Sequence, residues 1–347
     1  MSHRPRHLTA TLAAALLLAS VSGSVPVSAG AVRTAAPSHR AQASVAVPPA
    51  ATTPAPTPAI RVVNRTAFLP ATVRTATGAA AYAPVTAPPR LRARAWAVAD
   101  METGRILGTH RHRDRLPQAS TIKLLTAVTA AETVAAHPIH RVTWAEKRPQ
   151  YCSCAGLQVG RRYTRTTLLA GMLLPSGNDA AEALAGSHPR GRSAFVAEMN
   201  AEAGRLGASD THVVTPSGLT AAGAYSSARD LLVFLRAAQG SPVVEPILNL
   251  TSYRFGPVGG RTHRVYRSTD YVNKYYRLHP GTQGKGGYTT PAKNTLVVVT
   301  PIKGHRIGVA TLGAPSGYST KGARRLSLWA AQNFHSLRAV GVLPPVK

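Results

Sequence analysis

The chain has 347 residues, enough for one large domain or two small ones, and its 41 Lys and Arg outnumber its 13 Asp and Glu. This basic excess implies attraction to polyanions. The N-terminus points to export, which excludes nucleic acid and favours anionic polymers of the cell wall or membrane surface; a solvated arginine-rich face without a partner is the alternative.

Residues 1–29 have the features of a secretory signal peptide. Residues 3–7 form a basic start, residues 8–19 form an apolar run too short for a comfortable membrane span, and residues 27–29 are small enough for cleavage. An uncleaved membrane anchor is the alternative. Either way we expect the working part to be extracytoplasmic, secreted and associated with the cell wall.

Residues 30–90 are rich in Ala, Pro, Thr, Val and Ser, and five prolines lie between positions 48 and 58. Proline disfavours regular helix and sheet, so we expect an extended, mostly disordered tether. The folded domain is expected at residues 91–340, followed by a short tail at 341–347.

The predicted elements of the folded domain begin with a hairpin of strands and continue with helices. Apolar and β-branched runs joined by turn residues predict paired strands near both ends of the domain. A capping box at Ser227–Asp230 predicts the start of a helix. Hairpins at both ends with helices between them predict an antiparallel sheet flanked by helices. The strands are expected at 95–100, 105–109, 295–300 and 306–312, and the helices at 120–136, 166–174, 179–185, 193–206, 227–238 and 323–337.

The chain has two cysteines, Cys152 and Cys154, and no convincing metal site. Export favours a disulfide, but a Cys-x-Cys ring is small and strained, so a local disulfide and two free thiols both stay open. His110 and His112 lie in an arginine-rich stretch that we expect to be a solvated loop. We therefore predict no metal and no cofactor.

Ser120-Thr121-Ile122-Lys123 places a serine three residues before a lysine. On a helix this spacing puts the hydroxyl and the amine on one face. A lysine kept neutral by its surroundings can take the serine's proton and so activate it as a nucleophile. At a helix start, the Ser120 backbone N–H can also stabilise an oxyanion.

Two further motifs follow in the chain. Ser176-Gly177-Asn178 lies in a turn, where Ser176 could relay a proton and Asn178 could orient Lys123 and hold a substrate peptide. In Lys285-Gly286-Gly287, the lysine offers a charge for a carboxylate and the glycines allow close approach of a substrate backbone. Each motif alone is typical of an ordinary turn or loop; their combination and order carry the prediction.

Together the three motifs resemble those of serine-type D-alanyl-D-alanine carboxypeptidases, the low-molecular-mass penicillin-binding proteins. The likeness extends over residues 94–339 and includes the flanks of the second motif (173–181), two segments between the motifs (216–219 and 225–230), and His279-Pro280-Gly281 before the third.

The resemblance implies an α/β (α+β) penicillin-recognising fold, with a five-stranded antiparallel sheet flanked by helices and an all-helical lobe. It implies that Ser120 attacks the carbonyl between two D-alanines of a peptidoglycan stem peptide, that water hydrolyses the acyl-enzyme, and that β-lactams acylate Ser120. Lys285, Gly287 and Tyr288 would bind substrate, and the N–H groups of Ser120 and Tyr288 would form the oxyanion hole.

Two departures from the family pattern keep alternatives open. Gly286 stands where the family has a hydroxyl residue, and losing that charge-assisted hydrogen bond costs about 1.5–3 kcal/mol. A non-catalytic or weakly active wall-binding relative is therefore one alternative.

A β-lactamase is another alternative. Such an enzyme needs a carboxylate soon after the second motif, and Glu198 and Glu202 are available, but their segment resembles the carboxypeptidase pattern. The sequence ends at Lys347, so we expect neither the additional β-domain nor the amphipathic anchor of many relatives.

Overall fold

The computed structural model describes residues 60–63, 65–136, 140–147, 153–268 and 279–346; the predicted signal peptide and Cys152 lie outside these ranges. The helices of the described part, including two 3-10 turns, are η1 (Ala119–Ile122), α1 (Lys123–Thr133), α2 (Trp144–Lys147), α3 (Arg165–Leu173), α4 (Asn178–Gly186), α5 (Gly191–Arg205), α6 (Ala228–Gly240), α7 (Glu245–Asn249), α9 (Tyr318–Gln332) and η2 (Phe334–Ser336). The strands are β1 (Arg61–Val63), β2 (Thr66–Pro70), β3 (Thr72–Arg74), β4 (Ala80–Tyr82), β5 (Ala95–Asp100), β6 (Arg105–His110), β7 (His140–Arg141), β8 (Arg162–Tyr163), β9 (Ser252–Phe255), β10 (His263–Tyr266), β11 (Gln283–Thr289), β12 (Lys293–Ile302), β13 (His305–Ala314), β14 (Leu337–Arg338) and β15 (Gly341–Val342).

An antiparallel sheet with the order β1-β2-β6-β5-β13-β12-β11 runs through the domain. Its five strands from β6 to β11 form the sheet that the resemblance implies, and both expected hairpins, β5–β6 and β12–β13, are confirmed. Strands β2 and β1 extend the sheet beyond β6, while β14 and β15 pair with β2 and β6. Strand β11, which carries the third motif, forms the opposite edge.

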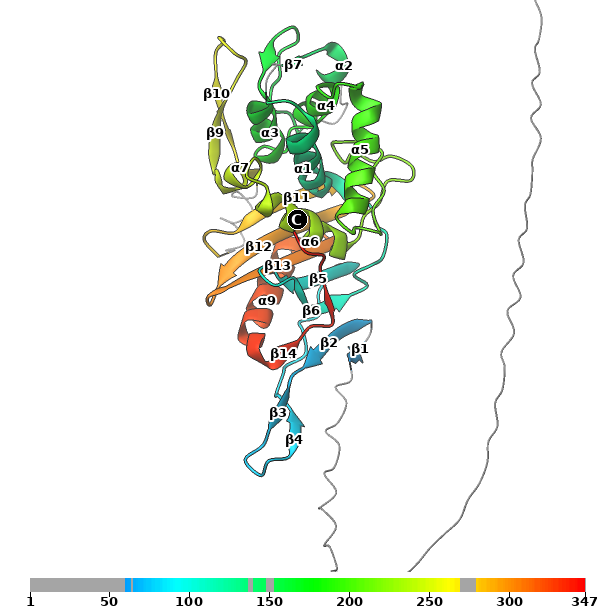
Figure 1. Ribbon diagram of the computed structural model, residues 1–347, viewed down its shortest axis with the longest axis vertical. Helices are drawn as coiled ribbons and strands as arrows, with labels where there is room; N and C mark the ends of the chain where they lie inside the picture. The colour runs from blue at the N-terminus through cyan, green and yellow to red at the C-terminus, as the bar shows by residue number, and fades with distance from the viewer. Residues whose placement is uncertain (1–59, 64, 137–139, 148–152, 269–278, 347) are drawn as a thin grey trace, which may run out of the picture. The chain divides into compact units, whose positions relative to one another are not determined.

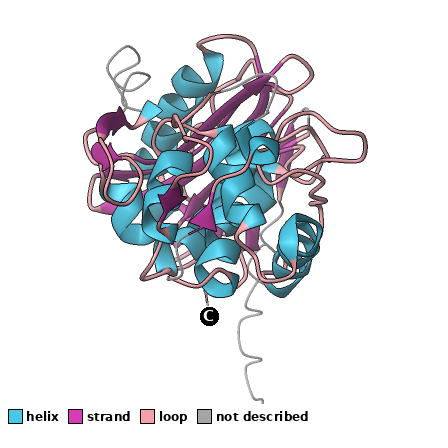
Figure 2. Cartoon of the chain, turned by 90° about the horizontal axis from the view of Figure 1, so that it is seen from above, coloured by secondary structure: helices cyan, strands magenta, loops and turns pink. Residues whose placement is uncertain are grey.

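The two faces of the sheet bury alternating residues of each strand, as the two-residue period of a strand requires. On β5, Trp96 and Val98 pack towards α9, while Ala97 and Ala99 pack towards α6 and the helical lobe. Figure 1 shows α9 on one side of the sheet and α1, α3, α4 and α5 beyond its other side. Figure 2, turned by 90°, shows strands between the helices. The helical lobe and the sheet therefore share one continuous core on the α6 side.

Part of the predicted tether is folded. Residues 61–63 form β1, and residues 66–82 contain β2–β4; β2 joins the main sheet by pairing Thr66, Ala67 and Phe68 with β6. Phe68 is buried against Trp329 of α9, with a ring-centroid distance of 6.3 Å. The tether prediction is wrong for this stretch because one buried aromatic residue and an open sheet edge outweigh the local composition. Residues 30–59 lie outside the described residues.

The structure confirms the predicted helices, with shifted boundaries. Ser227 caps α6 as expected, its Oγ accepting a hydrogen bond of 3.1 Å from Asp230 N. The last helix, α9, begins at Tyr318 instead of 323 and ends at Gln332 instead of 337. The C-terminal segment returns to the sheet as β14 and β15, and Leu343 is buried.

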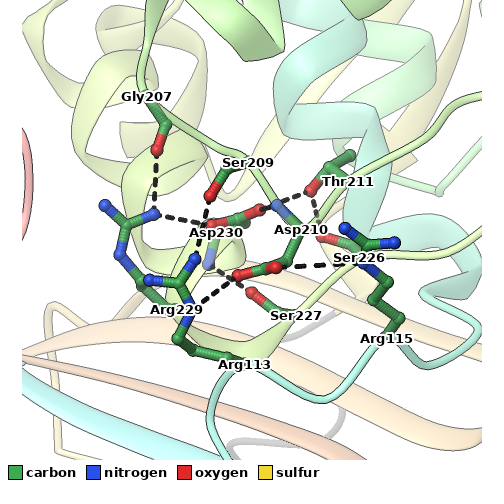
Figure 3. Close-up of polar contacts among 10 residues, drawn as sticks. All are labelled: Arg113, Arg115, Gly207, Ser209, Asp210, Thr211, Ser226, Ser227, Arg229 and Asp230. Atoms are coloured by element: carbon green, nitrogen blue, oxygen red, sulfur yellow. Dashed lines mark hydrogen bonds and ion pairs between the residues drawn. The ribbon is translucent and has the colours of Figure 1, made fainter.

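A network of arginine and aspartate residues connects the segment before η1 to the start of α6 (Figure 3). Asp230 is fully buried and accepts hydrogen bonds from Asp210 N (2.7 Å), the Thr211 hydroxyl (2.9 Å) and the Arg229 guanidinium (2.8 Å). Arg113 lies 3.0 Å from Asp210 in an ion pair. Burial raises the pKa of Asp230 although its partners favour the charged form. The network fixes the path of the chain that leads to Ser120.

The two histidines before η1 are more enclosed than expected. His110 ends β6, where its Nδ1 lies 3.0 Å from the Thr66 hydroxyl and its ring stacks on Trp96. Burial lowers the pKa values of both His110 and His112. The prediction of a solvated loop is therefore wrong for His110, which packs at the junction of β2, β5 and β6.

Within the described residues, no helix is long and apolar enough to span a membrane, and no group of three His, Cys, Asp or Glu could hold a metal ion. Cys154 is disulfide-bonded, so the alternative of a free thiol is wrong for this residue.

Candidate active site

Ser120 lies in η1, directly after a residue in an unfavourable backbone conformation. Ala119 has a φ of +49°, a left-handed conformation that residues other than glycine and asparagine rarely adopt. The carbonyl of Gln118 fixes this turn by accepting hydrogen bonds from the hydroxyls of Thr121 (2.5 Å) and Thr295 (3.0 Å). The turn thus holds Ser120, which is half-buried, at the edge of the cleft beside β11.

Lys123, the first residue of α1, is completely buried, and its amine contacts three segments of the chain. Its Nζ lies 2.9 Å from Ser120 Oγ, 2.7 Å from Asn178 Oδ1 and 2.6 Å from the carbonyl oxygen of Ser217. Burial lowers the pKa of Lys123 well below its usual value, and the positive charge of Lys285 lowers it further.

The protonation state of Lys123 determines the direction of these hydrogen bonds. A neutral amine has two protons and one lone pair, whereas an ammonium has three protons. The amide oxygen of Asn178 and the carbonyl oxygen of Ser217 can only accept. When the amine is neutral, its two protons are directed to these oxygens and its lone pair faces the Ser120 hydroxyl. The geometry suits a general base for Ser120.

The second motif forms the turn between α3 and α4. Ser176 has a φ of +67°, and its buried hydroxyl accepts a hydrogen bond of 2.8 Å from Lys285 Nζ. Asn178 is the first residue of α4, which places its amide oxygen beside Lys123. The turn therefore connects the two buried lysines through separate contacts.

Lys285 lies on β11 and is also buried. Its Nζ donates a second hydrogen bond of 2.8 Å to the carbonyl of Gly286. Burial lowers the pKa of Lys285 to about 7. Its positive charge is one cause of the low pKa of Lys123.

The glycines of the third motif differ in the space around them. A Cβ on Gly287 would lie 2.6 Å from the backbone nitrogen of Ser120, so no side chain fits there. A Cβ on Gly286 would meet nothing closer than 3.8 Å, so this position has room for a side chain. The absence of the family's hydroxyl at Gly286 is therefore not imposed by crowding.

Ser120 opens onto a cavity of about 820 Å³ between the helical lobe and the end of β11. Tyr288 is 61% exposed and forms part of the cavity wall. The residues that line the cavity are Ser120, Ser153, Asn178, Gly218, Leu219, Thr220, Tyr288, Thr289, Thr290 and Pro291. All seven residues predicted for the site lie in this cleft or directly beneath it.

Two contributors to the cleft received no role in the sequence analysis. The Ser217 carbonyl bonds Lys123, and Gly218 packs so closely that a Cβ would lie 2.0 Å from the carbonyl oxygen of Ala119. Their segment, 216–219, was noted only for its likeness to the family. Since both act through the backbone, side-chain chemistry gave no signal for them.

Asp179 is a third contributor to which the sequence analysis assigned no role. Its carboxylate accepts hydrogen bonds of 2.8–3.0 Å from the backbone nitrogens of Ala155, Gly156, Leu157 and Ala180. Asn178 N donates a further bond of 2.7 Å to the carbonyl of Ser153. These contacts hold the 153–157 loop as one wall of the cavity.

Comparison with known proteins identifies similar chains. A model of the family described as D-alanyl-D-alanine carboxypeptidase matches residues 82–316. The D-alanyl-D-alanine carboxypeptidase DacB2 of Mycobacterium tuberculosis is 37% identical over 223 residues, 63% of this chain and 74% of the relative. The carboxypeptidase DacD of Salmonella typhimurium is 31% identical over 287 residues, 77% and 70% of the two chains. A crystal structure of a D-alanyl-D-alanine carboxypeptidase from Mycobacterium tuberculosis aligns with a TM-score of 0.68 at 34% identity, covering 75% of this chain and 98% of the other.

Gly218→Ala tests whether the 216–219 segment positions Ser120. Gly218 and Gly223 both have a φ of +78°, so alanine at either costs about 1–2 kcal/mol of backbone strain. Only Gly218 abuts Ala119; the nearest atom to a Cβ on Gly223 lies 3.9 Å away. We expect Gly218→Ala to slow covalent labelling of Ser120 by a fluorescent penicillin about a hundredfold, and Gly223→Ala to leave it nearly unchanged. Equal labelling of the two variants would contradict this role.

Proposed function

The chain belongs to the D-alanyl-D-alanine carboxypeptidase family and is a hydrolase of this serine type; from this premise we propose that it is exported and removes the terminal D-alanine from peptidoglycan stem peptides through an acyl-enzyme on Ser120. The contact of a buried, depressed-pKa Lys123 with Ser120 carries the proposal. β-Lactams would acylate the same hydroxyl.

In the first step, neutral Lys123 takes the hydroxyl proton of Ser120, and Ser120 Oγ forms a bond to the carbonyl carbon between the two D-alanines. The carbonyl oxygen becomes an oxyanion that the N–H groups of Ser120 and Tyr288 stabilise. The contact of Gly287 with Ser120 N supports this arrangement, because it brings the backbone of β11 beside the start of η1.

In the second step, the C–N bond breaks and the leaving amine of D-alanine receives a proton. We propose that Ser176 relays the proton that Lys123 took from Ser120. Its hydroxyl accepts a hydrogen bond from Lys285, and Asn178, two residues later, bonds Lys123, which supports a position of Ser176 near the reacting groups. Water then attacks the ester carbonyl while Lys123 takes a proton from it. The bond between the carbonyl carbon and Ser120 Oγ breaks, Lys123 returns the proton to Ser120 Oγ, and the shortened peptide leaves as a carboxylate.

The alternative of a β-lactamase receives less support from the cleft. Such an enzyme needs a carboxylate that activates the deacylating water. Glu198 pairs with Arg190, and Glu202 pairs with Arg205 on α5; neither glutamate lines the cavity of Ser120. A weakly active wall-binding relative remains the second candidate, because Gly286 lacks the hydroxyl that would help to bind a substrate carboxylate.

The proposal is tested by intact-mass spectrometry of the full-length protein after incubation with a penicillin. We expect one stable adduct on Ser120, no adduct in Ser120→Ala or Lys123→Ala, and release of D-alanine from a stem-peptide mimic by the unmodified enzyme only. Rapid loss of the drug without an adduct would favour a β-lactamase. Unchanged drug and protein would favour the wall-binding relative.

The pH dependence of acylation tests the coupling of the two lysines. Lys123 must be neutral, so acylation is lost as the pH falls below its pKa. Since the charge of Lys285 lowers that pKa, Lys285→Gln should raise it and move the acidic limb of the rate profile to higher pH. Lys303→Gln, in the exposed β12–β13 turn, serves as the control. An acidic limb that stays in place or moves to lower pH would contradict the coupling.

Restoring the missing hydroxyl tests the consequence of Gly286. The position has room for a side chain, so Gly286→Thr should raise kcat/KM for a peptide with a free terminal carboxylate roughly ten- to a hundredfold. The same peptide with an amidated C-terminus should gain little. Gly287→Thr is the control, since its side chain would collide with Ser120 N and abolish turnover. A Gly286→Thr variant without any gain would show that Thr289, Thr290 or another group already binds the carboxylate.

A further inference from the structure

Two short strand pairs of the helical lobe expose an unusual concentration of arginine. Arg254 of β9 lies directly opposite Arg264 of β10, and Arg141 of β7 lies directly opposite Arg162 of β8. All four side chains are exposed. Like charges placed directly opposite one another destabilise a strand pair. Two such pairs therefore lower the stability of the fold, and folding alone gives no reason for them.

The two strand pairs are joined into one surface. Val258, between β9 and β10, donates a backbone hydrogen bond of 2.9 Å to the carbonyl of Arg162. The guanidinium of Arg161 lies close to Gly260 in the same loop, so close that a Cβ on Gly260 would be 2.7 Å from it. With the exposed Arg261, these residues form what we call the arginine surface: Arg141, Arg161, Arg162, Arg254, Arg261 and Arg264.

The arginine surface has little local counter-charge. No Asp or Glu occurs in residues 153–167 or 251–268. In the part of the chain that the structure describes, none of its six arginines forms an ion pair, and those with hydrogen-bond partners contact hydroxyls and backbone carbonyls instead. Arginine presents a planar fork of donors that matches carboxylates, and these forks remain largely available to a ligand.

The arginine surface adjoins the catalytic cavity. His263 of β10 contacts the carbonyl oxygen of Ala155 at 2.9 Å, and Ala155 belongs to the 153–157 loop that Asp179 holds against the cleft. Ser153 of this loop lines the cavity of Ser120. Figure 1 shows β9 and β10 alongside α3, on the outer side of the helical lobe. A polymer that enters the cavity could reach this surface over the 153–157 loop.

We propose that the arginine surface binds carboxylates of neighbouring stem peptides on the same peptidoglycan polymer that the cavity cleaves. This inference rests on the proposed function for the identity of the polymer. Each uncut stem peptide ends in a free carboxylate, so a strand with many stems is a linear polyanion. The surface would hold the polymer while a single stem occupies the cavity, and a soluble peptide would gain nothing from it.

The test compares Arg254→Gln/Arg264→Gln with Arg324→Gln/Arg325→Gln, an equal loss of charge from two exposed arginines of α9. Both are made in the full-length protein that also carries Ser120→Ala, which removes turnover through the proposed nucleophile. Because the readout is binding and not catalysis, its failure is distinguishable from failure of the proposed function. Cosedimentation is measured with peptidoglycan from which phosphate polymers have been stripped. A second set with Ser120 intact is assayed on a soluble stem-peptide mimic.

We expect Arg254→Gln/Arg264→Gln to weaken binding to stripped peptidoglycan about tenfold, and added salt to weaken binding of the unsubstituted surface. Turnover of the soluble peptide should stay unchanged. The thermal midpoint should stay the same or rise, because the repulsion between two like charges on facing residues is removed. Unchanged binding would overturn the proposal. If the α9 variant lost as much binding, net charge and not the arginine surface would account for binding. If the protein bound only peptidoglycan that still carried its phosphate polymers, those polymers and not the stem peptides would be the ligand.

Discussion

A lysine amine without access to water is the constraint on which the architecture of the cleft depends. Lys123 is fully buried, so its amine must find hydrogen-bond partners within the protein, and burial favours its neutral form. The partners come from η1, α4 and the 216–219 segment. Three parts of the chain that are distant from one another in sequence must therefore meet at one nitrogen atom. The hydrogen bonds that satisfy this amine also place it against Ser120.

That meeting point is held under backbone strain. Ala119, which precedes the proposed nucleophile, and Ser176, which bonds Lys285, both have positive φ, which costs free energy that the surroundings must supply. Thr295 of β12 secures the first turn through the Gln118 carbonyl, and Asp179 of α4 secures the second through the 153–157 loop. The rigid sheet and the helical lobe thus stabilise two turns that would relax in isolation. Catalytic groups positioned in this way need little reorganisation during reaction.

The sequence predicts side chains at short spacing better than it predicts backbone contacts between distant segments. Ser120 and Lys123 are recognisable because both belong to one turn, and Lys285 because glycines surround it. The Ser217 carbonyl gives no such signal, since every residue has one and only the fold brings this one to Lys123. Strand β2 was missed for a related reason: burial of Phe68 against α9 outweighs its local composition. The boundaries of α9 differ because propensity alone does not locate where packing begins.

The buried and the exposed positive charges of the chain have separate effects. Screening by salt limits exposed charges to an effective distance of about 10 Å, so distant surface arginines contribute little to the ionisation of Lys123. The cation that depresses its pKa is Lys285, which is buried and therefore weakly screened. Under the proposed export to a wall of anionic polymer, the surface arginines would have a different role, in which they act on the substrate and not on the base. The buried pair of lysines would then set the chemistry, while the exposed arginines set how long the polymer stays.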